Sequence, residues 1–337
     1  MLRLIGRRLL TALPSVVGVI IVTFLLTRVL PGDPAAYFAG PAATPAAIAE
    51  VRKQLGLDKS LPEQFVSYVG NLVRGDLGTS LTTGRPVVTE LAARLPASAE
   101  LTLMGLILSF MIAVPLGIVA AIRQGSWIDH LCRVLATAGV SLPVFFTGLL
   151  FVYAFYYILG WAPSPVGRID VFFSPPPTVT GFYVIDSLIA RDFESLRAAL
   201  SQLALPVATL AVFSLAPIAR ITRASMLGVL SSEFVRSARA SGLAPKTIII
   251  TYAFRNALIP VVTTIGMVFS FLLGANVLVE KVFAWPGVGS YAIEALIASD
   301  FAPVQGFVLT MAILYIAINL IIDLLYGVID PRVRIES

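Results

Sequence analysis

Six long runs without a charged residue are the feature that most constrains this chain. They cover residues 9–27, 101–122, 134–167, 198–219, 256–279 and 301–322, and each holds about 19 residues or more. At a rise of 1.5 Å per residue, about 20 helical residues cross a hydrocarbon core of roughly 30 Å. An ion at the bilayer centre costs at least about 2.5 kcal/mol, so charge-free runs of this length predict membrane spans. The sequence therefore predicts an all-α, polytopic membrane protein with six transmembrane helices.

Composition supports a membrane environment and excludes several other kinds of protein. The chain is 58% hydrophobic and 13% charged, whereas soluble domains carry about 25% charged residues, so lipid must cover much of its surface. One cysteine, Cys132, and one histidine, His130, exclude a disulfide framework and metal sites built from clusters of these residues. The net charge of +5 comes from basic residues in short loops between apolar runs. We therefore expect a lipid bilayer as the surroundings, no bound metal and no nucleic acid partner.

Lysine and arginine are unevenly divided between the two sides of the predicted spans. An even number of spans places both termini on one side, and on that side basic residues greatly outnumber acids. The positive-inside rule therefore predicts a multi-pass protein with its N- and C-termini in the cytoplasm. The basic residues of this side are Arg3, Arg7, Arg8, Arg123, Arg133, Arg220, Arg223, Arg236, Arg239, Lys246, Arg255, Arg332 and Arg334.

The spans divide the chain into three predicted regions. Residues 1–30 form the cytoplasmic N-terminus and the first transmembrane helix, which we expect to be retained because its apolar run exceeds the roughly 7–15 residues of a signal peptide. Residues 31–98 form an external, periplasmic helical subdomain. Residues 99–337 form a five-helix transmembrane core that includes a cytoplasmic coupling loop, residues 220–256.

Two short helices are predicted inside the external subdomain. Thr44 suits the N-cap of a helix that begins at Pro45, and Gly56 suits its end. Ser60 suits the cap of a second helix that closes at Gly75. This subdomain would face the side from which a substrate is delivered.

The most informative segment is residues 233–260, which read EFVRSARASGLAPKTIIITYAFRNALIP. A short helix is predicted from about Ser231 to Ser241, because Gly242 suits the position just after a helix end. Pro245 suits the first turn of a second helix that runs towards Asn256. Such a pair of helices fits docking into a groove on a cytoplasmic partner. It also fits an amphipathic helix on anionic lipid, with its arginines near the headgroups.

This segment resembles the cytoplasmic "EAA" loop of ABC importer permeases. More closely, EFVRSARASGL followed by RNALIPVVT is similar to the dipeptide/oligopeptide (DppB/OppB-like) branch of that family, and TGFYVIDSLI resembles its dipeptide permease B subunits in particular. The family motif has Glu-Ala-Ala where this chain has Arg236, Ser237 and Ala238, with its acid one turn earlier at Glu233. Other matching pieces, in the same order, are RRLLTALPSVVGVIIVTFLLTRVLPGDP, GDLGTSLTTGRPV, FAWPGVGSYAIEAL and DLLYGVIDPRVR.

The resemblance implies a type I ABC importer permease fold in the bacterial plasma (inner) membrane. It implies a subunit that forms half of a translocation pathway for dipeptides or short oligopeptides. The implied partners are a second homologous permease subunit, two cytoplasmic ATPase subunits and an external substrate-binding protein. The positions expected to couple this chain to the ATPase subunits are Glu233, Phe234, Arg236, Ala238, Arg239, Gly242, Leu243, Asn256 and Pro260.

Catalysis is not expected on this chain. It contains no G-x-x-x-x-G-K-[ST] phosphate loop, so ATP and Mg²⁺ would be bound by the partner ATPase subunits, with no cofactor here. One acid, Asp323, lies near the inner end of the sixth span with Asn319 one turn away. An acid in such a place suits either a structural pairing or a polar position in the pathway.

Alternative functions remain open at this stage. The same fold would serve the import of another small solute, such as glutathione, haem or a nickel complex. An ion-coupled secondary transporter would need several ionisable groups within its spans or paired broken helices, and among the predicted spans Asp323 is the one plausible candidate.

Overall fold

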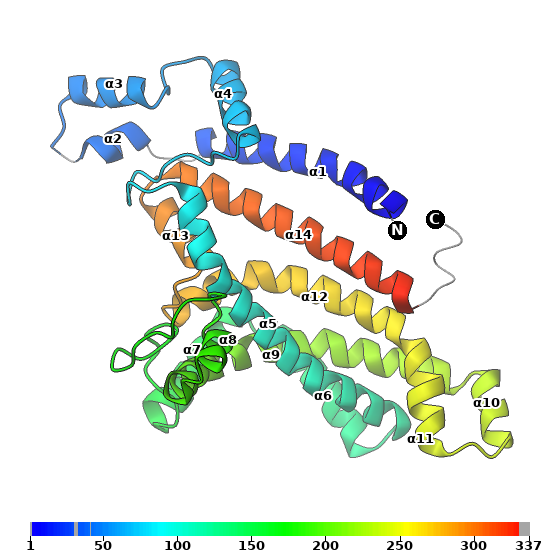
Figure 1. Cartoon of the computed structure of the whole chain (residues 1–337). Coiled ribbons are helices and arrows are strands. Elements are labelled where there is room, and N and C mark those ends of the chain that lie inside the picture. Colours follow the sequence, from blue (N-terminus) through cyan, green and yellow to red (C-terminus); the bar gives the residue numbers. More distant parts are fainter. Residues whose placement is uncertain (1, 30–32, 41, 330–337) are drawn as a thin grey trace. The chain divides into compact units, whose positions relative to one another are not determined.

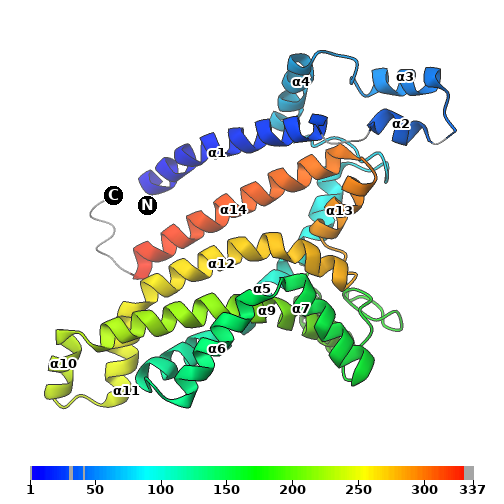
Figure 2. The ribbon, with the colours of Figure 1, turned by 180° about the vertical axis from the view of Figure 1, so that it is seen from behind.

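The computed structural model describes residues 2–29, 33–40 and 42–329 (Figures 1 and 2). Within those residues the chain is helical, and the one strand-like pairing is an isolated antiparallel bridge between Thr79 and Pro86. The all-α prediction is therefore confirmed. The helices are α1 (Leu2–Val29), α2 (Pro34–Ala39), α3 (Pro45–Gln54), α4 (Leu61–Val73), α5 (Val87–Ile122), α6 (Trp127–Ser141), α7 (Val144–Phe151), η1 (Val152–Ile158), α8 (Tyr183–Ala190), α9 (Phe193–Leu230), α10 (Glu233–Ala240), α11 (Pro245–Thr247), η2 (Ile248–Phe254), α12 (Arg255–Val282), α13 (Val288–Ile297) and α14 (Phe301–Ile329), where η1 and η2 are π-helical.

The chain divides into two compact units. Unit 1 comprises Met1–Ser98 and Pro286–Ala317, and it holds α1 to α4, the start of α5, α13 and the first part of α14. Unit 2 comprises Ala99–Trp285 and Ile318–Ser337, and it holds the rest of α5, α6 to α12 and the end of α14.

The core of unit 1 lies between the start of α5 and α13. Val87 and Leu91 of α5 pack against Val288 and Tyr291 of α13, and all four are at most 4% exposed. The backbone N–H of Val288 donates a 2.9 Å hydrogen bond to the hydroxyl of Ser98. This bond satisfies an amide of the first turn of α13, which has no partner within its own helix.

Helix α1 is held within unit 1 by aromatic and polar contacts. Phe24 packs against Phe65 and Tyr68 of α4, with ring centroids 5.2 and 5.8 Å apart. The side-chain amide of Gln305 in α14 donates a 2.7 Å hydrogen bond to the hydroxyl of Thr27. The first predicted span is thus tied to a helix of the 31–98 region and to α14.

The capping signals in residues 31–98 are confirmed. The hydroxyl of Thr44 accepts a hydrogen bond from a first-turn amide of α3, and Pro45 is the first helical residue. Gly56, just beyond that helix, has a φ of +65°, which suits a residue without a Cβ. The N–H of Ser60 donates a 3.1 Å bond to the carboxylate of Glu63, as in a capping box at the start of α4.

Helix α9 is the element around which unit 2 is packed. Helices α6, α7, α8 and α12 each contact it, and both ribbon views show α9 and α12 side by side (Figures 1 and 2). Near the end of α5, a Cβ added at Gly117 would lie 2.7 Å from the Cβ of Thr222. Helices α5 and α9 therefore approach closely here because Gly117 has no side chain.

The described residues contain four helices that are long and apolar enough to cross a membrane: Val87–Ile122, Phe193–Leu230, Pro245–Val282 and Phe301–Leu324. They contain the predicted runs 101–122, 198–219, 256–279 and 301–322. Of the remaining runs, 9–27 nearly coincides with the shorter apolar helix Leu10–Leu25, and 134–167 contains the shorter apolar helix Val144–Ile158.

The run 134–167 is not one continuous helix. Helix α6 ends at Ser141, because Leu142 is extended, with φ −109° and ψ +140°. A separate helix, α7, begins after Pro143. A residue before proline avoids the helical region, because the proline ring clashes with its backbone. Charge counting cannot detect such a break.

The predicted loop 220–256 is much shorter than expected. Helix α9 continues to Leu230, and a helix resumes at Pro245 and runs without interruption into α12. Arg220 and Arg223 end the charge-free run but do not end the helix, because arginine is a good helix former. The connection between the two long helices is therefore residues 231–244, with α10 inside it.

Candidate functional site

Residues 231–254 form a helical hairpin, called here the coupling hairpin, at one end of α9 and α12 (Figure 1). Helix α10 begins after the extended Ser232 and carries the acid Glu233 at its first position, where the helix dipole favours negative charge. Gly242 ends the hairpin's first arm with a φ of +74°, and its N–H donates to the carbonyl of Arg239. The predicted break at Gly242 and the helix start at Pro245 are both confirmed.

One face of α10 is packed against the second arm of the hairpin. Val235 is fully buried and Ala238 is 7% exposed, and both pack against Ile248 of η2. Phe234, which shares a face with Ala238 by its i, i+4 spacing, is 45% exposed. Val235 and Ala238, which are three residues apart, point inward, so the large apolar ring of Phe234 stays exposed.

The outer face of α10 is charged. Glu233 forms an ion pair with Arg236, and both side chains are 78% exposed. Such exposed pairs contribute at most about 1 kcal/mol, so this pair adds little to the stability of the hairpin. Arg236 and Arg239 are both exposed, so the surface of this helix carries a net positive charge.

The second arm of the hairpin contains the π-helical segment η2 between α11 and α12. The side-chain amide of Asn256 donates a 2.6 Å bond to the carbonyl of Tyr252, and Pro260 lies inside α12. A π segment is a wider helical turn that costs regular hydrogen bonding and recurs at functional sites. Here it joins the hairpin directly to one of the four long apolar helices.

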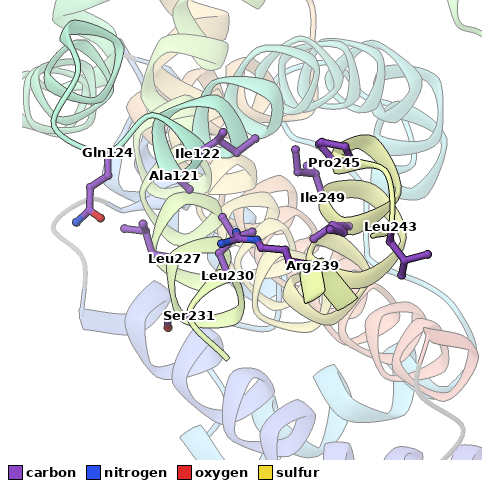
Figure 3. A pocket seen from close by; sticks show the side chains of 11 residues that line it. Ala121, Ile122, Gln124, Leu227, Leu230, Ser231, Arg239, Leu243, Pro245 and Ile249 are labelled. Carbon is purple, nitrogen blue, oxygen red and sulfur yellow. The ribbon is translucent and has the colours of Figure 1, made fainter. Parts of the chain in front are cut away.

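An open cavity of about 510 Å³ lies beside the hairpin (Figure 3). Its walls are mainly apolar, and Figure 3 shows the side chain of Arg239 reaching into this space towards Leu230. Apolar walls with one guanidinium suit an apolar side chain that has an acidic neighbour. The lining residues are Ala121, Ile122, Gln124, Leu227, Leu230, Ser231, Arg239, Leu243, Pro245, Ile248 and Ile249.

A buried ion pair fixes the α5–α6 turn to α9 near this cavity. Asp129 is 1% exposed, and its carboxylate accepts hydrogen bonds from the guanidinium of Arg223 and from the N–H of Gly125. The bond from Arg223, with the backbone bond, lowers the pKa of Asp129 from 3.8 to about 2. The carboxylate is therefore charged at neutral pH and holds the two elements together.

A second buried ion pair anchors the segment between η1 and α9. The guanidinium of Arg168 donates 2.6 Å to Glu100 of α5 and 2.7 Å to the carbonyl of Gly181. The other Glu100 oxygen accepts a 2.8 Å bond from the N–H of Val184, and the guanidinium lies 3.6 Å from the ring centre of Tyr183. These contacts bind the start of α8 to α5.

Two family models match almost the whole chain. Residues 113–335 match the family described as "Binding-protein-dependent transport system inner membrane component", and residues 1–102 match its N-terminal companion. The first match alone covers more than half of the chain. The chain belongs to this family of binding-protein-dependent transport permeases.

Several relatives of this permease carry names that refer to peptide transport. It is 45% identical over 318 residues to "Probable D,D-dipeptide transport system permease protein DdpB" of Escherichia coli K12, which covers 94% of this chain and 93% of that protein. It is 41% identical to the di/tripeptide permease DppB of Pseudomonas aeruginosa UCBPP-PA14, over 99% of both chains. It is 38% identical to the dipeptide permease DppB of E. coli K12, again over 99% of both chains.

A solved structure shows the same fold. An inward-facing crystal form of the MetNI methionine ABC transporter aligns with a TM-score of 0.51 at 18% identity, covering 70% of this chain and 93% of that chain. At this identity the match supports the permease fold alone.

The predicted coupling residues of the permease fall in two places. Glu233, Phe234, Arg236, Ala238 and Arg239 lie on α10, and Gly242 and Leu243 form the turn after it. Asn256 and Pro260 lie instead on α12, and neither lines the cavity. Whether any of these positions contacts an ATPase subunit stays a prediction.

The predicted polar pair Asn319 and Asp323 lies on α14, one turn apart and half-buried. Neither residue is without a partner. Arg332, a basic residue near Asp323 in sequence that could pair with it, lies outside the described residues. The role of the pair therefore also stays a prediction.

Sequence reasoning missed the buried acids of the permease. It treated Asp323 as the one plausible acid in a span, but Glu100 and Glu280 are each 1% exposed, and Glu280 accepts a 2.9 Å bond from Asn276. Glu100 directly precedes the charge-free run 101–122, and Glu280 directly follows the run 256–279. This position at the boundary of a predicted span was the signal that could have pointed to them. Their partners are distant in sequence or on the inner face of a helix, so the sequence alone did not reveal them.

Proposed function

We propose that this permease is one of two membrane subunits of an ATP-driven importer for dipeptides or short oligopeptides. The observation that carries the proposal is the identity of 38–45% over nearly the full chain to permeases named for dipeptide or di/tripeptide transport. Relatives that match only a fold would not share residues along the whole length. The proposal includes a second, homologous permease subunit as a partner and an external binding protein that delivers the peptide.

In this proposal the coupling hairpin docks on a cytoplasmic ATPase subunit. The support is physical: α10 presents the exposed ring of Phe234 and a basic surface, while its opposite face is packed against Ile248. A force on α10 would pass through this packed face into η2 and α12, which are continuous. Such a connection transmits motion from the hairpin to a membrane-spanning helix.

The ATP and Mg²⁺ of the cycle are bound by the ATPase partners, and this chain is not an enzyme in the proposal. ATP can drive transport only if it binds one conformation of the complex better than the other. The permease contributes the pathway and the hairpin that senses the ATPase state. Both termini and the hairpin lie in the cytoplasm, in agreement with the excess of basic residues on that side.

A second candidate substrate is a peptide of D-amino acids. The relative with 45% identity is named as a probable D,D-dipeptide permease, whereas the relatives named for dipeptides or di/tripeptides are 38–41% identical. Uptake of L-alanyl-L-alanine and D-alanyl-D-alanine by the same complex would separate these two candidates.

The decisive experiment is reconstitution of the permease with its partner subunits and binding protein in proteoliposomes. We expect uptake of labelled dipeptide that requires ATP and stops without the binding protein. Uptake driven by a proton or sodium gradient without ATP would instead establish a secondary transporter. ATP-dependent uptake of glutathione, haem or a nickel complex in place of peptides would keep the mechanism and change the substrate.

The docking role of the hairpin is tested by Phe234→Ala. We expect this change to weaken recovery of the ATPase subunits in a pull-down from mild detergent, because the exposed ring is the largest apolar group on the outer face of α10. The matched control is Phe172→Ala, which removes a 90% exposed ring far from the hairpin in sequence. Equal recovery with both variants would contradict docking through Phe234.

A further inference from the structure

A second cavity lies in unit 1, and nothing in the proposed coupling cycle uses it. Its volume is about 260 Å³, and it is formed by the turn after α3, one face of α4, the turn after α4 and the start of α14. The residues from α4 are Gln64, Ser67, Tyr68 and Asn71, which share one face by their i, i+3, i+4, i+7 spacing. Unlike the cavity beside the hairpin, this one is lined mainly by polar groups.

Two side chains of opposite charge line this cavity. The ammonium of Lys59 comes from the turn before α4 and the carboxylate of Asp76 from the turn after it. Both side chains are exposed, and among the residues that the structure describes neither forms an ion pair. One cavity therefore offers a cationic donor and an anionic acceptor to the same ligand.

The backbone that carries each charge is held in place. The side-chain amide of Gln64 donates to the carbonyls of Leu57 (3.4 Å) and Lys59 (2.9 Å), which fixes the first turn to α4. The carboxylate of Asp76 accepts a 2.8 Å bond from the N–H of Gly78, which orients it and leaves its second oxygen available. The backbone of Lys59 and the carboxylate of Asp76 therefore start from ordered positions, which reduces the entropy lost on binding.

We propose that this cavity binds a zwitterionic dipeptide, with Lys59 on its carboxylate and Asp76 on its ammonium group. The proposal deepens the proposed function, because it places a peptide site on the side from which the binding protein would deliver substrate. Charge-assisted hydrogen bonds at each end of the ligand supply the recognition. The side-chain amide of Asn71, which also lines the cavity, can bond the peptide group between the two ends.

The size of the cavity limits the ligand. A sphere of 260 Å³ is about 8 Å across, and an extended chain advances roughly 3.5 Å per residue. Two extended residues are therefore about as long as the cavity is wide. A longer peptide would have to leave one terminus outside, and would lose one of the two charged contacts.

The test measures peptide binding to the complete importer in lipid nanodiscs without the external binding protein. The probes are L-alanyl-L-alanine and N-acetyl-L-alanyl-L-alanine, which has no ammonium group. We expect Asp76→Asn to weaken binding of the free dipeptide roughly tenfold, the value of one charge-assisted bond, and to leave binding of the acetylated probe unchanged. Lys59→Gln should weaken binding of both probes, because both keep the carboxylate.

The matched control is Asp58→Asn, which removes an exposed acid next to Lys59 that does not line the cavity. This variant should bind both probes as the wild type does. Equal affinities in all variants, or an equal loss for both probes in Asp76→Asn, would overturn the inference. ATP-driven peptide uptake in proteoliposomes would be unaffected by that result, so failure here is distinguishable from failure of the proposed function.

Discussion

At the scale of single residues, two ion pairs of the permease differ mainly in burial. In the pair of Asp129 with Arg223, the aspartate side chain is 2% exposed and the arginine side chain 20%. In the pair of Glu233 with Arg236, both side chains are 78% exposed. Removing one member of a buried pair leaves the other charge without its partner, while an exposed charge is simply solvated by water. The two pairs therefore make opposite predictions for the same chemical change.

We predict that Asp129→Asn destabilises the permease and Glu233→Gln does not. The first change should lower the free energy of unfolding by about 2 kcal/mol, the value of hydrogen bonds to a charged group. The second should change it by less than about 0.5 kcal/mol. Thermal unfolding of the purified chains in detergent at neutral pH measures both, and equal shifts would contradict the assignment of Asp129 as a structural anchor.

The same carboxylate predicts an acid-dependent loss of stability. Its pKa is lowered from 3.8 to about 2, first by the hydrogen bond from Arg223. A group with a lowered pKa in the folded state stabilises that state above its unfolded pKa, and the contribution disappears as the pH falls from about 4 to 2. The stability difference between wild type and Asp129→Asn should therefore shrink across this window in denaturation experiments. A difference independent of pH would show that the carboxylate does not titrate with folding.

At the scale of elements, the coupling hairpin depends on one backbone position. Gly242 has a φ of +74°, and a Cβ added there would meet no neighbouring atom within 4 Å, so its requirement is conformational rather than steric. Gly228, inside α9, has equally open surroundings but a helical backbone. The two glycines thus separate the effect of backbone strain from the effect of an added methyl group.

We predict that Gly242→Ala impairs the hairpin and Gly228→Ala is tolerated. Alanine at a left-handed position costs about 1 kcal/mol, whereas alanine within a helix is favoured over glycine by a similar amount. In proteoliposomes with all partners, Gly242→Ala should lower the peptide imported per ATP hydrolysed. Gly228→Ala should keep the wild-type ratio. An unchanged ratio in both variants would argue that the turn does not carry the coupling.

Local signals predicted the elements well where they act within a few residues. The cap at Thr44, the turn at Gly242 and the start at Pro245 each depend on neighbours within one helical turn, and the structure has all three. The proline at position 143 is also a local signal, and it favours a kink in the third charge-free run, where the structure has a break. The inward face of α10 depends on η2, so Val235 was not recognised.

Contacts between distant residues set the limit of prediction from this sequence. Asp129 and Arg223 are 94 residues apart, and Glu100 and Arg168 are 68 apart. No periodicity within one helix links the members of such pairs. The family resemblance, in contrast, used short motifs in a fixed order along the whole chain, and the matches over residues 1–102 and 113–335 confirm it.

At the scale of the whole molecule, apolar side chains are exposed along the long helices. Met267 and Phe271 of α12 are 61% and 71% exposed, and Ile313 and Ile321 of α14 are 54% and 55% exposed. Exposed apolar groups at this density need lipid or another apolar subunit around them. They agree with a permease that occupies a bilayer.

The orientation of the chain in that bilayer is a prediction that its single cysteine makes easy to test. Cys132 is 1% exposed, so Cys132→Ser gives a cysteine-free background with one substitution in a buried site. Ser241→Cys then places a thiol on the exposed end of the coupling hairpin, and Phe172→Cys places one in the segment before α8, where the native side chain is 90% exposed. Each thiol can be labelled by a maleimide that does not cross membranes.

In intact spheroplasts we expect the reagent to modify the cysteine at position 172 and to modify the one at 241 only after the membrane is opened. The reason is the charge distribution: basic residues cluster on the hairpin side, where the positive-inside rule places the cytoplasm. ATP and its ATPase subunits are found on that side alone. Labelling of position 241 from outside would therefore reverse the orientation and, with it, remove the hairpin from the reach of any ATPase.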